Sequence, residues 1–130
     1  MEGFVAITMA SKKLDFNDIN KKISIVPSKI IRNGQSLALN RISSMDKWIY
    51  KDYYNDDNFG EILNNFLDKL IPYAPYFMQM REKCNIELNC YTTTEWGQLG
   101  VILTREIVDK ICRLDVGINF HILSYGMVKE

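Results

Sequence analysis

The side chains best suited to chemistry in this sequence are one histidine and three cysteines. His121 lies inside the apolar run INFHIL, where an imidazole is usually half-buried and hydrogen-bonded rather than catalytic. Cys84, Cys90 and Cys112 share no metal-ligand spacing, whereas a structural zinc site draws four ligands at close spacing. The sequence therefore predicts no metal site, and we interpret the cysteines as small buried residues of a reducing compartment.

Two pairs of carboxylates could divide the roles of acid and base. These are Asp56 with Asp57, and Glu106 with Asp109. Such a pair works in catalysis only when burial separates the two pKa values. The first pair lies in the most polar stretch of the chain, and the second opens a predicted helix, where acids are favoured by the helix dipole. The sequence also has no phosphate-binding glycine loop and no GxSxG motif. We therefore predict a protein that is not an enzyme and that needs no cofactor.

The most unusual segment runs from Trp48 to Glu61 and reads WIYKDYYNDDNFGE. It combines aromatic residues, which are enriched in protein interfaces, with a run of acids that would suit a basic partner. The alternative is a strand that ends in a solvated turn, with Trp48 in the core, Tyr50 buried on the same face, and Tyr53 and Tyr54 covering the edge of the sheet. The candidate partner-binding residues are Tyr50, Tyr53, Tyr54, Asp56, Asp57, Glu61, Glu95 and Trp96.

Composition sets limits on the class of protein. The 130 residues are 47% hydrophobic and 25% charged, which is typical of one globular domain spanning residues 1–130. No apolar run approaches the roughly 20 residues that a membrane helix needs, and the N-terminus lacks the order of a secretory signal. We therefore expect a cytoplasmic protein that does not bind membranes.

Charge is balanced overall but unevenly spread. Residues 1–51 hold nine Lys and Arg against four Asp and Glu, and residues 52–130 hold seven against twelve. Four lysines cluster at residues 11–13 and 20–22, and so few positive charges give only a low affinity for a phosphate backbone. We therefore predict no nucleic-acid partner. We expect the fold to interleave the two oppositely charged halves.

The elements that must position these residues follow from hydrophobic periodicity. Strands are predicted at residues 4–8, 23–31, 46–54, 86–91 and 118–123, with Pro27 confining the second of them to an edge. Helices are predicted after Asp15, after Asn58, near Pro75 and after Thr104. A turn at Gly97 is expected to return residues 99–103 as a paired strand. Together these predict an α+β, two-layer sandwich, a mainly antiparallel sheet with helices packed on one face.

The order of these signals resembles a bacterial family known as domain of unknown function 4279. The matching features are Pro27 followed by Gly34, Trp48 on a strand, the leucine-rich helix after it, and a closing hairpin, helix and strand. The resemblance covers nearly the whole chain. It implies no activity and no functional residues, because the family has none assigned. Proteins of this type are similar to members of toxin–immunity loci, which is an analogy of type rather than of motif.

Two functions remain open from the sequence. The first is a non-enzymatic protein-binding module, an immunity protein that neutralises a cognate bacterial toxin, with a basic toxin domain as its partner. The alternative is a small-molecule-binding or regulatory domain, with a ligand between the sheet and the helices. The oligomeric state and the strand order do not follow from the sequence.

Overall fold

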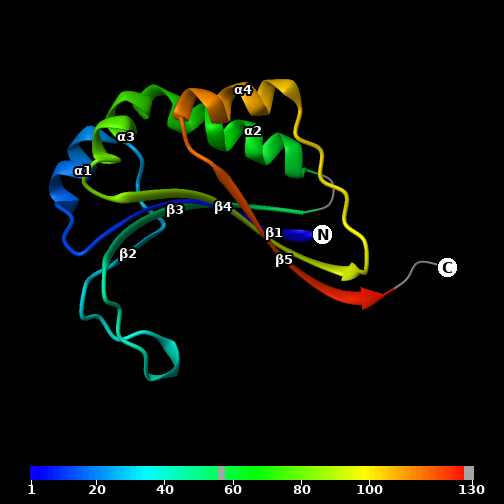
Figure 1. Ribbon diagram of the computed structural model, residues 1–130, viewed down its shortest axis with the longest axis horizontal. Helices are drawn as coiled ribbons and strands as arrows, with labels where there is room; N and C mark the ends of the chain where they lie inside the picture. The colour runs from blue at the N-terminus through cyan, green and yellow to red at the C-terminus, as the bar shows by residue number, and fades with distance from the viewer. Residues whose placement is uncertain (56–57, 128–130) are drawn as a thin grey trace.

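The computed structural model describes residues 1–55 and 58–127, in which strands and helices alternate irregularly (Figure 1). In chain order the elements are β1 (Glu2–Ser11), α1 (Phe16–Lys22), β2 (Lys29–Ile31), the 3₁₀ turn η1 (Ala38–Asn40), β3 (Asp46–Tyr54), α2 (Phe59–Leu70), the 3₁₀ turn η2 (Ile71–Tyr73), α3 (Ala74–Met80), β4 (Asn85–Trp96), α4 (Arg105–Leu114) and β5 (Ile118–Met127).

The five strands form one sheet in the order β2-β3-β1-β4-β5. β1 pairs antiparallel with both β3 and β4, β2 pairs antiparallel with β3, and β5 runs parallel to β4. Figure 1 shows α2, α3 and α4 stacked above one face of this sheet. The prediction of an α+β sandwich with a mainly antiparallel sheet is confirmed. We call the face that these helices leave uncovered the open face.

The core fills the space between the sheet and the helices. Alternation along β1 turns Val5, Ile7 and Met9 toward the helices, and all three are fully buried. Trp48 of β3 is also fully buried, as the sequence predicts. From the other layer, α2 contributes buried residues at helical spacing, namely Phe59, Leu63, Phe66, Leu67 and Leu70.

Two predicted helix caps are confirmed. The Asp15 carboxylate accepts a hydrogen bond from the Asp18 backbone N–H at the start of α1. Likewise, the Thr104 hydroxyl accepts one from the Ile107 N–H at the start of α4. Each cap satisfies a donor that the first turn of a helix leaves free.

The predicted hairpin at Gly97 is wrong. β4 continues to Trp96, residues 97–104 form no strand, and the strand that joins β4 on its outer side is β5. The segment is an extended crossing from the end of β4 to α4, in which Val101 and Leu103 pack against the core while Ile102 is 79% exposed. This alternation imitates a strand, because any extended chain lying over a core turns every second side chain inward.

The two charged halves of the sequence are partly separated. β1, β2 and β3, from the basic half, occupy one side of the sheet, and β4 and β5 occupy the other. Full interleaving, which we expected, is therefore wrong for the sheet. Among the helices described, none has both the length and the apolar character needed to cross a bilayer.

Candidate binding face

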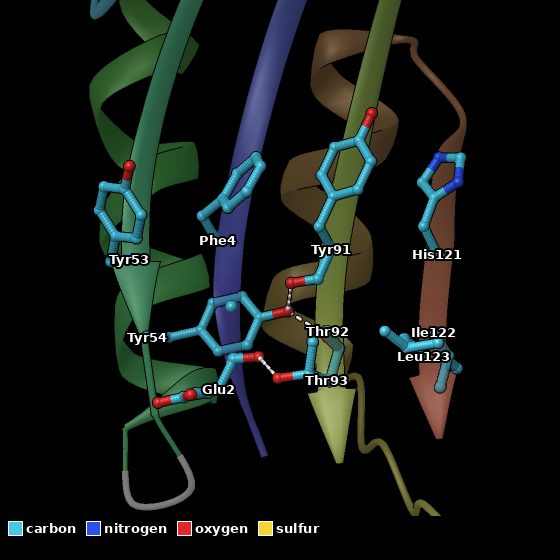
Figure 2. Close-up of a pocket in the computed structure, with 11 residues that line it drawn as sticks. Glu2, Phe4, Tyr53, Tyr54, Tyr91, Thr92, Thr93, His121, Ile122 and Leu123 are labelled. Carbon is cyan, nitrogen blue, oxygen red and sulfur yellow. Dashed lines mark hydrogen bonds between the residues drawn. The ribbon is translucent and has the colours of Figure 1, made fainter. Parts of the chain in front are cut away.

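Four rings stand next to one another across the open face (Figure 2). The register pairs Phe4 of β1 with Tyr53 of β3 and with Tyr91 of β4, and it pairs Tyr91 with His121 of β5. The four residues thus form one line across adjacent strands, in the order Tyr53, Phe4, Tyr91, His121. We call this line the aromatic row.

Neighbouring rings of the aromatic row are in contact. Tyr91 and His121 are stacked, with centroids 4.5 Å apart and planes 11° apart. On the other side of Tyr91, the Phe4 centroid lies at 4.8 Å, and Tyr53 lies 5.7 Å beyond Phe4. Both sides of the Tyr91 ring are therefore engaged by its neighbours, so the central ring of the aromatic row is held in place before a partner binds. Rigidity lowers the entropic cost of binding a partner.

Lys51 places a positive charge on the Tyr53 side of the aromatic row. Its Nζ lies 4.8 Å from the centroid of Phe4 and 5.6 Å from that of Tyr53. Contacts of this kind are attractive, because the face of an aromatic ring is electron-rich. The ammonium thus stabilises the orientation of two rings of the row.

His121 is held from the side by a chain of polar groups. Its Nε2 lies 3.0 Å from Oδ1 of Asn89, whose Nδ2 donates to the Glu87 carboxylate at 3.4 Å. Because the amide nitrogen faces Glu87, the amide oxygen faces the imidazole, and Nε2–H is the donor. The predicted hydrogen bond of His121 is confirmed. The expectation that His121 is half-buried is wrong, because β5 is an edge strand and the ring is exposed on the open face.

A hollow of about 560 Å³ opens beside the aromatic row. Glu2, Thr93 and Leu123 line it below the rings in Figure 2. The Thr93 hydroxyl donates to the main-chain oxygen of Glu2 at 3.4 Å, while Leu123 is 55% exposed. The volume falls within the roughly 300–1,000 Å³ of ligand pockets, and the mixture of apolar walls with a few polar groups is typical of them.

Gly3 allows the strands beneath the hollow to come close together. A Cβ atom at this position would lie 1.7 Å from the main-chain oxygen of Tyr91, so no side chain fits there. Across this glycine the Tyr54 hydroxyl reaches β4, where it donates to the same Tyr91 oxygen at 3.0 Å and lies in hydrogen-bond contact with the Thr92 hydroxyl. These hydrogen bonds hold the main chain at Tyr91, the central residue of the aromatic row, from the helix-covered side of the sheet.

The structure does not bring the predicted tyrosines together on one surface. Tyr53 is 65% exposed in the aromatic row, but Tyr50 and Tyr54 lie on the helix-covered face. Tyr50 stacks on Phe66 of α2 at 5.2 Å, and Tyr54 is only 4% exposed. The grouping is wrong because neighbouring strand residues point to opposite faces, and Tyr54 shares the parity of Trp48.

The other predicted site residues are also dispersed. Glu61 is exposed in the first turn of α2, on the helix side of the sheet. Glu95 and Trp96 are exposed at the end of β4, and Trp96 is not at a hairpin tip; its main-chain oxygen accepts from the Ser124 hydroxyl at 2.6 Å. Asp56 and Asp57 lie outside the described residues.

Sequence reasoning missed Phe4, Tyr91 and His121 as members of one surface. The alternation of side chains along each strand does predict that these three residues point away from the core. What joins them is the pairing of β1 with β4 and of β4 with β5, and that pairing is not visible in a single sequence. Within the described ranges 1–55 and 58–127, no three His, Cys, Asp or Glu side chains gather to hold a metal ion.

Comparison with known proteins identifies one family. The family model described as "Domain of unknown function (DUF4279)" matches residues 1–125. No curated protein and no solved structure shows significant similarity to the chain. The match covers every strand and helix described above except the last residues of β5.

Proposed function

Because the chain belongs to the DUF4279 family, which has no assigned activity, we propose its function from the geometry of the open face. The protein is a non-enzymatic binding protein that holds a partner protein against the aromatic row and the hollow beside it. The observation that carries this proposal is the exposed line of contacting rings across four strands, of which Tyr53 and Tyr91 are 65% and 38% exposed.

Exposed aromatic residues in a fixed arrangement are a common basis of protein recognition. Tyrosine is enriched among the residues that dominate binding energy, because its ring buries a large area and its hydroxyl can still hydrogen-bond. Leu123 and the rings line the hollow with apolar atoms, so one apolar side chain of the partner can bind there. A contiguous apolar patch of this kind on the surface of a protein marks an interaction site.

The partner that we propose is a basic toxin domain, which an immunity-type protein would neutralise by covering its active surface. The exposed Glu2 lies at the hollow and supplies a carboxylate for a basic residue of the partner. A charged pair at the rim of an interface contributes mainly to the rate of association and to specificity.

The test is a titration of the protein with purified toxin domains encoded beside its gene, with calorimetry and toxin activity as readouts. We expect Tyr53→Ala to weaken binding by about tenfold or more, and Glu2→Gln to weaken it less and mainly at low salt. The matched controls are Met78→Ala and Glu61→Gln, which remove an exposed apolar side chain and an exposed acid from the helix layer.

Two results would overturn the proposal. If none of the neighbouring toxin domains binds, the immunity role is excluded. If one binds but the loss follows Glu61→Gln rather than Tyr53→Ala, the contact surface is on the helix side of the molecule.

A small aromatic ligand in the hollow is the second candidate, favoured by the volume and the mixed lining of the hollow. The space between the sheet and the helices is filled by the core cluster, so we place such a ligand on the open face. The probe is 8-anilinonaphthalene-1-sulfonate, a flat anionic dye whose fluorescence rises in apolar sites. Saturable binding at one site that Tyr53→Ala weakens would support this candidate, and no saturable binding would remove it.

A further inference from the structure

The two edges of the sheet differ in how they are protected against pairing with another chain. β2, at one edge, has only three residues, begins with Lys29 and follows Pro27 closely. Short length, lysine and proline are the features that keep edge strands from associating. β5, at the other edge, has ten residues and contains no Lys, Arg, Asp, Glu or Pro. As far as Ser124, beyond which an irregularity interrupts its pairing with β4, its edge therefore lacks the protection that the opposite edge has.

β5 has the composition of an interior strand. On the helix side Ile118 and Phe120 pack against the core, but Ile122 is 51% exposed. On the open face Leu123 and Tyr125 are 55% and 66% exposed. Apolar residues on both faces are typical of strands that are covered on both faces, whereas these residues of β5 are exposed. The outer N–H and C=O groups of β5 are the ones that a further strand would use.

We propose that β5 pairs antiparallel with β5 of a second copy of the chain, so that two sheets join into one. Charge favours a second copy over a different protein. In a twofold arrangement each residue faces a residue of the same strand, and an uncharged strand brings no like charges together. It also offers no charge by which a different strand would be selected. The proposal does not depend on the proposed function.

The twofold symmetry fixes how the two copies lie relative to each other. A twofold axis perpendicular to the sheet keeps the helix layers of both copies on one side and joins the two open faces. With Ile122 opposite its own copy, His121 lies opposite the second copy's Leu123, on the open face. The two hollows, each lined by His121 and Leu123, then lie next to each other across the axis. The dimer thus presents both hollows on one continuous face.

The experiment uses the full chain and measures its mass in solution by sedimentation equilibrium across a wide range of concentrations. We expect the wild type to approach twice the mass of one chain. Ile122→Lys, and separately Ile122→Glu, should raise the dimer dissociation constant about tenfold or more, because each places like charges across the axis. A mixture of the two variants should recover dimers, because in a mixed dimer the lysine of one chain lies opposite the glutamate of the other.

The matched control is Ile42→Lys, which adds the same charge at an apolar residue that is 68% exposed near the protected edge. It should dimerise as the wild type does. Far-UV circular dichroism and the melting temperature show whether each variant is folded, and Leu123→Glu is the second variant if Ile122→Lys unfolds. A wild type that stays monomeric at every concentration overturns the proposal. So does a dimer that the β5 variants leave intact or that Ile42→Lys disrupts.

Discussion

The hydroxyl of Tyr54 donates a hydrogen bond to the main-chain oxygen of Tyr91 at 3.0 Å, across the intervening strand β1. Burial raises the pKa of this phenol, so Tyr54 stays protonated and remains a donor at neutral pH. The bond joins the helix-covered side of β3 to the strand that carries the centre of the aromatic row. A residue in the core thus positions the candidate binding surface on the opposite face.

Replacing Tyr54 by phenylalanine should lower the free energy of unfolding by about 1–2 kcal/mol. The ring still fills its place against Phe59, but the hydroxyl of Thr92 and the oxygen of Tyr91 lose a partner away from water. Urea unfolding measures the change. The control is Tyr53→Phe, which removes a hydroxyl from a 65% exposed ring and should stay within about 0.5 kcal/mol of the wild type. Equal losses in the two variants would contradict a specific role for the Tyr54 bond.

A methyl group at Gly3 should be more damaging than any surface change. Its Cβ would lie 1.7 Å from the Tyr91 oxygen, so β1 and β4 must separate locally. We expect Gly3→Ala to cost about 1–3 kcal/mol or more, measured by thermal unfolding. Gly60→Ala is the matched control, because Gly60 lies in α2 with no heavy atom within 4 Å of its missing Cβ. It should raise stability by about 0.5–1 kcal/mol, since alanine is favoured over glycine in helices. A neutral Gly3→Ala would contradict the close approach of β1 to β4.

Much of the fold could be predicted from local patterns. The run of apolar residues at helical spacing predicts α2, and the alternation around Trp48 predicts β3 with its buried side. The caps at Asp15 and Thr104 were visible because a short polar side chain precedes a helical run in each case. These features depend on residues within a few positions of one another, so a single sequence contains them.

The candidate site could not be predicted in the same way, because it depends on which strands are neighbours. Tyr53 was among the predicted residues, yet both Phe4 and Tyr91, which lie with it in the aromatic row, are far from it in sequence. The tyrosine that follows Tyr53 was wrongly placed on the same surface, although the parity of the strand indicates the opposite face. The parallel pairing of β5 with β4 could not be predicted either. The extended segment 97–104 has the alternating pattern of a strand, so it was mistaken for the strand that pairs with β4.

The hydrogen bonds of the Asp46 carboxylate should make the free energy of unfolding depend on pH in the acidic range. Its carboxylate accepts hydrogen bonds from the backbone N–H groups of Asn33, at 2.7 Å, and of Leu14, at 2.9 Å. These bonds hold the pKa of Asp46 below its ordinary value. A group whose pKa is lowered by folding stabilises the fold above its unfolded pKa, and this contribution is lost as the pH falls through the lowered value. The chain segments after β1 and β2 should therefore loosen together in acid.

The variant that tests this is Asp46→Asn, compared with the wild type by urea unfolding between neutral and acidic pH. At neutral pH we expect a loss of about 1 kcal/mol, a modest figure because the carboxylate is near the surface. The difference should shrink as the pH falls below the ordinary range of an aspartate, because the protonated wild type then resembles the amide. A difference that stays constant with pH would show that the charge of Asp46 does not matter.

The three cysteines should differ sharply in reactivity, which tests the packing of the two layers. Cys90 is fully buried and Cys84 is 8% exposed, while Cys112 is exposed on α4, contrary to our expectation that all three are buried. Burial raises the pKa of Cys90 to about 12 and also raises that of Cys84, so both stay as unreactive thiols at neutral pH. We expect a disulfide reagent to modify one thiol per folded chain and all three in urea. Cys112→Ser should abolish the fast reaction. Rapid modification of Cys90 in the folded protein would mean that the sheet and the helices separate readily.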